Sequence, residues 1–109
     1  MNLVISQSET SNLAFVMALM RKEVKKMFKM QDKKLLKTYD TILNDLEAVL
    51  EVLKERDINT LARLEITLEQ ARMTLNFVEW YLSNNITNSI IENDFISLKD
   101  KLVEAINND

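Results

Sequence analysis

Apolar side chains in the segment 60–83 fall on two opposite sides of a helical wheel. One stripe advances in steps of three and four residues and consists of Leu61, Leu64, Leu68, Ala71, Leu75, Val78 and Leu82. The second stripe lies about half a turn away and consists of Ile66, Met73, Phe77 and Trp80. Steps of three and four keep side chains on one face of a helix. The pattern therefore predicts one helix over 60–83 that has to be covered from both sides.

A helix is also predicted from Gln7 to about residue 30. Ser6 and Glu9 have the spacing of a capping box, in which each side chain accepts a hydrogen bond from the backbone of the other residue. The apolar seam of this helix consists of Leu13, Met17, Met20, Val24 and Met27. Phe15, Val16 and Leu19 make its first half apolar nearly all round, so we expect that half to be deeply covered. The short apolar lead 2–5 is expected to dock as an extension.

The next apolar seam repeats every seven residues but is offset by one position from the seam before it. Its members are Leu35, Tyr39, Ile42, Leu46, Val49 and Leu53. The offset fits either a new helix with Asp32 as its N-cap, which we favour, or a stutter in one long helix that continues the first. The polar segment 56–60 then predicts a turn that sends the helix over 60–83 back antiparallel. A last helix is predicted after a capping box of Ser89 and Glu92.

These elements predict an all-α fold of a single domain over 1–109. We expect a four-helix bundle in which the second and third helices form a central antiparallel hairpin. The bundle would have three helices if the first two are continuous. A long hairpin alone leaves one broad side uncovered, so we expect the protein to form a homodimer or to bind another protein there.

Composition argues against most enzymatic chemistry. The chain has no histidine and no cysteine, so the commonest general base, the thiol nucleophile and the usual zinc ligands are missing. It has no glycine, so a glycine-rich phosphate loop is excluded. We therefore expect no catalytic, cofactor-binding or metal-binding residues. Apolar runs are too short to span a membrane, and no secretory signal is apparent, so a cytoplasmic location is expected.

Basic residues are concentrated in the segment 21–37, which holds eight Lys and Arg but only two acidic residues, in a chain of net charge −3. A lysine ridge is predicted on the first helix and the start of the second, with Lys22, Lys25, Lys26, Lys29 and Lys33 as its candidate nucleic-acid contacts. Such lysines neutralise phosphates and release counterions. The alternative interpretation is a solvated face that keeps the protein soluble.

The second stripe of the segment 60–83 is the candidate partner-binding surface. Trp and Phe are frequent anchors of protein interfaces, and Met adapts to irregular surfaces. The predicted contact residues are Ile66, Met73, Phe77 and Trp80. Equal weight goes to the interpretation that these residues are ordinary core, covered by another helix of the same chain. The sequence thus predicts a small non-enzymatic interaction module such as an adaptor, chaperone-like or regulatory protein, with a nucleic-acid-associated regulator as the alternative.

Overall fold

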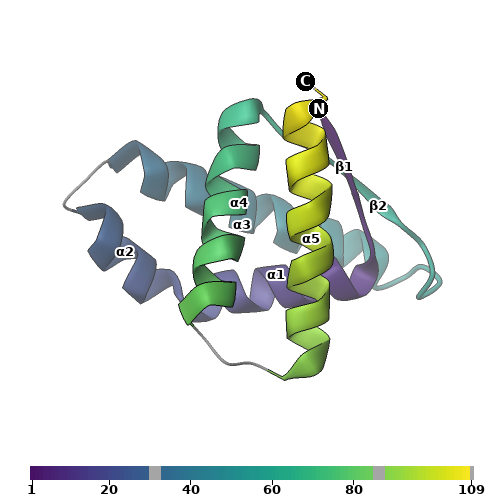
Figure 1. Cartoon of the computed structure of the whole chain (residues 1–109). Coiled ribbons are helices and arrows are strands. Elements are labelled where there is room, and N and C mark those ends of the chain that lie inside the picture. The colour runs from purple at the N-terminus through teal and green to yellow at the C-terminus, as the bar shows by residue number, and fades with distance from the viewer. Residues whose placement is uncertain (30–32, 85–87, 109) are drawn as a thin grey trace.

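The computed structural model describes residues 1–29, 33–84 and 88–108, and within them the chain is mostly helical (Figure 1). The expected all-α class is confirmed at this level, with a small sheet in addition. In chain order the elements are β1 (Asn2–Ile5), α1 (Gln7–Leu19), α2 (Arg21–Lys29), α3 (Lys33–Leu53), β2 (Ala62–Glu65), α4 (Leu68–Asn84) and α5 (Ser89–Asn107). No helix in the described part is long and apolar enough to cross a membrane.

The start of α1 is the capping box that the sequence predicts. The Glu9 amide donates to Ser6 Oγ over 3.0 Å, and the Ser6 amide donates to Glu9 Oε1 over 2.8 Å. These bonds satisfy amides that would otherwise lack partners in the first turn. The box fixes the point at which the extended N-terminal segment becomes a helix.

The helix expected over 7–30 is instead two helices that meet at Met20. Backbone hydrogen bonds continue across the junction, from the Met20 amide to Val16 O and from the Val24 amide to Met20 O. Arg21, the first residue of α2, forms a two-pronged ion pair with Asp40 of α3, with N–O distances of 2.8 Å. The pair ties α2 to α3 and is half-exposed. Both α1 and α2 pack against α3, so α2 and α3 are separate helices rather than one long one. Asp32, the predicted N-cap, lies outside the described residues.

The prediction of one helix over 60–83 is wrong for its first part. Residues 62–65 form β2, which pairs antiparallel with β1 in the register Asn2↔Glu65 to Ile5↔Ala62. Ala62 and Leu64 are buried while Arg63 and Glu65 are exposed, which is the alternation of a strand. The helix begins only at Leu68, after a reciprocal pair of hydrogen bonds between Thr67 and Gln70.

The helices are consequently arranged differently from the predicted bundle. α4 packs most extensively against α5, its neighbour in the chain, and this pair crosses α1 and α3, which lie behind it (Figure 1). The N-cap of α5 is Asn88, whose Oδ1 accepts from the Ile91 amide over 3.0 Å, rather than the predicted Ser89. The expected central hairpin of the second and third helices is therefore replaced by the α4–α5 hairpin.

All seven elements contribute buried side chains to the core. The contribution of α2 includes Val24, whereas its lysines Lys22, Lys25 and Lys26 are exposed. Tyr39 of α3 lies in the middle of the core and donates from its hydroxyl to Met17 O of α1 over 2.5 Å. Burial raises the pKa of this phenol. The Tyr39 ring meets Phe77 of α4 edge-on at a centroid distance of 5.4 Å, and Tyr81 of α4 lies 5.1 Å from Phe95 of α5. Aromatic packing thus joins three helices across the crossing point.

Candidate interaction surfaces

The second stripe of the segment 60–83 lies in the core of the chain. Ile66, Met73 and Phe77 are only 3%, 3% and 5% exposed. Ile66 is not on the helix at all, because it follows β2 and exchanges two backbone hydrogen bonds with Met1. Trp80 is half-buried, with its ring 6.0 Å from that of Phe77. In the single chain these residues therefore form no continuous exposed stripe, which matches the interpretation of the stripe as core.

The predicted lysine ridge is exposed where the structure describes it. Lys22, Lys25 and Lys26 project from α2, and Lys33 opens α3. Lys29 is the last residue of α2, but its side chain lies outside the described part. Because α2 packs against α3, both groups of lysines lie at one end of the molecule (Figure 1). Arg21 differs from them, since its guanidinium is held by Asp40, which raises the pKa of Arg21 and lowers the pKa of Asp40.

Two large apolar residues on α1 are exposed, although the sequence predicts that they are covered. Phe15 is 59% and Leu19 is 63% exposed. They lie one helix turn apart, which places them on the same face. The opposite face of α1 carries Leu13 and Met17, both of which are fully buried, and the neighbouring Val16 is buried as well.

α5 meets this face of α1 at its polar end. Asp94 of α5 accepts hydrogen bonds from Ser8 Oγ over 2.6 Å and from Asn12 Nδ2 over 2.5 Å. Positions 8, 12, 15 and 19 form one stripe along a helix. α5 therefore contacts the polar first half of the stripe, where Ser8 is exposed and Asn12 half-buried, while Phe15 and Leu19 in its apolar second half are exposed. A uniformly apolar helix segment gives no sequence signal for which of its faces remains open.

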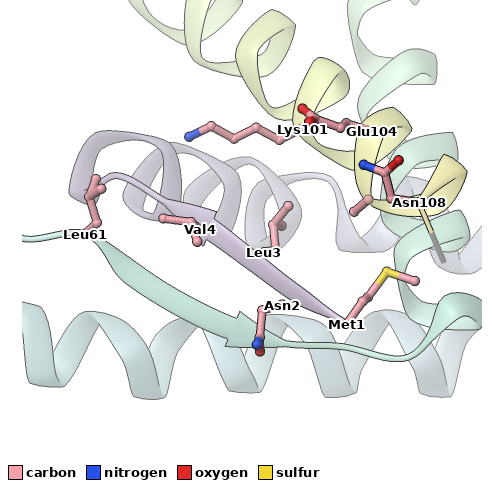
Figure 2. A pocket seen from close by; sticks show the side chains of 9 residues that line it. Met1, Asn2, Leu3, Val4, Leu61, Lys101, Glu104 and Asn108 are labelled. Atoms are coloured by element: carbon pink, nitrogen blue, oxygen red, sulfur yellow. The ribbon is translucent and has the colours of Figure 1, made fainter.

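A groove separates β1 from the C-terminal half of α5 (Figure 2). Its volume is about 720 Å³, within the range of ligand-binding pockets. The strand side is formed by residues 1–4 together with Leu61, and the helix side by Lys101, Glu104, Ala105 and Asn108. Figure 2 shows the Lys101 side chain extending from α5 across the upper side of this groove.

The charged end of Lys101 is already engaged. Its Nζ donates to Glu9 Oε1 over 2.6 Å, and Glu9 is buried. Burial opposes ionisation of Glu9, but hydrogen bonds from Lys101 and from the Ser6 backbone outweigh it, so the pKa of Glu9 lies below its ordinary value. Glu9 is therefore an ionised structural carboxylate that joins α1 to α5.

The described residues contain no group of three or more carboxylates close enough together to hold a metal ion. Glu51 near the end of α3 pairs over 2.8 Å with Lys54, the first residue after the helix, at an exposed position, which is the arrangement of a solvated surface. Comparison of the chain with protein-family models, with curated proteins and with solved structures gave no match. The candidate sites accordingly rest on geometry and chemistry alone.

Proposed function

We propose that the protein is a non-enzymatic interaction module that binds a partner protein through the Phe15–Leu19 face of α1. The observation that carries the proposal is the exposure of two large apolar side chains one turn apart on a helix whose other face is fully buried. Single exposed apolar residues are ordinary, but adjacent large ones on a well-anchored helix are typical of contact surfaces. Because the buried face of α1 packs against the core, the helix that carries Phe15 and Leu19 is already ordered, and binding a partner would cost little backbone entropy.

The charge beside this face defines the chemistry of the partner. Lys22, Lys25 and Lys26 follow directly on α2, and all three are exposed. A segment that covers Phe15 and Leu19 and continues along α2 would need apolar residues followed by acidic ones. An amphipathic helix with an acidic end meets both requirements. The lysines would then mainly accelerate association, and the apolar anchors would mainly slow dissociation.

Photo-crosslinking from position 15 tests this proposal. A photo-reactive phenylalanine analogue at Phe15 should capture a defined protein from an extract of the source cells, or a second copy of the chain. The control places the same analogue at Val52 on α3, which is also 59% exposed. A partner captured equally from both positions would contradict the proposal, and so would the absence of any specific product from position 15. Sedimentation equilibrium of the purified chain then separates self-association from binding to another protein.

A nucleic-acid-associated regulator is the second candidate. It is favoured by the packing of α2 against α3, which brings Lys22, Lys25, Lys26 and Lys33 to one end of the molecule. Binding to a labelled DNA duplex should then fall steeply as salt rises, because counterions are released. The double change Lys25→Glu with Lys26→Glu should abolish this binding, while Phe15→Ser should leave it intact. A salt-independent affinity, or none at low salt, would exclude this function.

A further inference from the structure

The hydrogen-bonding pattern of the small sheet identifies which edge groups of β1 are free. Met1 and Ile66 exchange both backbone hydrogen bonds, at 3.1 and 2.9 Å, and so form a hydrogen-bonded pair. In an antiparallel ladder such pairs alternate with pairs that do not bond each other. With the observed register, Leu3 and Ile5 bond β2, whereas the amide and carbonyl groups of Asn2 and Val4 point away from it.

These outward groups face the groove between β1 and α5. Asn2 and Val4 both line the groove, and α5 packs alongside β1 (Figure 2). Among the described residues, no hydrogen bond is made by the outward amide and carbonyl groups of Asn2 and Val4. β1 therefore presents two donors and two acceptors at the two-residue spacing of a strand edge.

We propose that this groove binds an extended peptide segment of a partner protein, which adds a third strand to the sheet beside β1. Only an extended backbone offers alternating donors and acceptors that match those of Asn2 and Val4, and strand addition is an established mode of peptide recognition. α5 forms the other side of the groove, so the added strand would lie beside β1 and against the residues of α5 that line the groove. This site shares no residue with the Phe15–Leu19 face and does not depend on the function proposed for it.

The side chains around the groove define the peptide further. Leu3, Val4, Leu61 and Ala105 supply an apolar lining, which favours small aliphatic residues at alternate positions of the peptide. Lys101 is held by Glu9, whereas Glu104 is exposed and makes no side-chain ion pair with a described residue. The α5 wall thus carries the negative charge of Glu104, which favours a lysine or arginine at the peptide position beside it, while the strand side carries the Met1 ammonium, which donates to Ile66 O.

The test starts from a displayed library of random nine-residue peptides selected on the full chain. Enriched peptides should alternate aliphatic residues and carry a basic residue. The selected peptide, titrated into ¹⁵N-labelled protein, should move the amide proton signals of Asn2 and Val4 downfield as their hydrogen bonds form. N-methylation of the peptide amides that face β1 should remove binding, whereas methylation of the alternate amides should leave it.

A matched pair of protein variants locates the site. Ala105→Arg fills the groove and should weaken binding at least tenfold. Val103→Arg, two residues away on the same helix but not in the groove, should leave the affinity unchanged. The proposal is overturned if no peptide is enriched, if Ala105→Arg binds as tightly as the native chain, or if only Phe15→Ser removes binding. A selected peptide that induces dimers without shifting the Asn2 and Val4 signals would also overturn it.

Discussion

The ammonium group of Lys101 lies 2.6 Å from a carboxylate oxygen of Glu9, a residue 92 positions earlier in the chain. The same oxygen accepts the Ser6 amide and so belongs to the cap of α1. One buried carboxylate therefore fixes the first turn of α1 and docks the last helix onto it.

This relationship predicts a loss of stability in acid. The pKa of Glu9 in the folded chain lies below its unfolded value of 4.5, so its ionisation stabilises the fold above that pH and the contribution disappears as pH falls through the folded pKa. Glu9→Gln should lower the free energy of unfolding at pH 7 by about 1–3 kcal/mol. Urea unfolding from pH 7 to pH 3 should show this difference shrinking towards the acid end. The exposed Glu104→Gln serves as control and should follow the native curve.

Tyr39 should make the fold sensitive to alkali. Burial raises the pKa of its phenol, so the folded state favours the neutral form, and stability should decline as pH rises above the ordinary tyrosine value of about 10. Tyr39→Phe removes the hydrogen bond to Met17 O and should cost about 1–2 kcal/mol at pH 7. The variant should also lose less stability than the native chain between pH 9 and pH 11, within about the range where tyrosine ionises. Parallel declines in both proteins would show that Tyr39 does not titrate as described.

Truncation of a core aromatic residue should destabilise the chain far more than truncation of a surface one. Phe77→Ala should destabilise the chain by about 3–5 kcal/mol, because it empties a buried site between α3 and α4. Phe15→Ser should change stability by no more than about 0.5 kcal/mol, because its side chain is already exposed. Thermal unfolding of both variants measures the contrast. A strongly destabilised Phe15→Ser would mean that this residue is covered in solution.

Hydrogen exchange should reproduce the register of the sheet. The amides of Leu3 and Ile5 bond β2 and should exchange slowly, while those of Asn2 and Val4 point into the groove and should exchange fast. NMR of the free chain measures the hydrogen-exchange rate of each of these four amides. Slow exchange at all four residues, or the reverse alternation, would contradict the register.

Local signals in the sequence predict a large part of this fold. The Ser6–Glu9 box, the seven-residue seam of α3 and the presence of a last helix from about residue 89 all depend on neighbours within a few residues. The prediction of a helix over residues 62–66 was wrong for a physical reason. Ala62, Leu64 and Ile66 alternate with polar residues, but Leu61, Leu64 and Leu68 also fit a helix, and the strand that decides between them lies some sixty residues away.

The candidate sites were less predictable than the fold. The lysines of α2 are visible in the sequence because charge is a property of each residue. Exposure of Phe15 and Leu19 depends on where the other helices cross α1, and α5 meets that face near Ser8 and Asn12. The free edge of β1 likewise depends on a pairing between distant strands. Both surfaces are tertiary features with no local signature.

The most direct measurement of the central claim is calorimetric titration of the partner captured at position 15 into three proteins, namely the native chain, the double variant Phe15→Ser with Leu19→Ser, and the control Val52→Ser. The double variant should bind at least tenfold more weakly while keeping the native helical circular dichroism, and the control should bind like the native chain. Equal affinity of the native chain and the folded double variant would show that the Phe15–Leu19 face is not the contact surface.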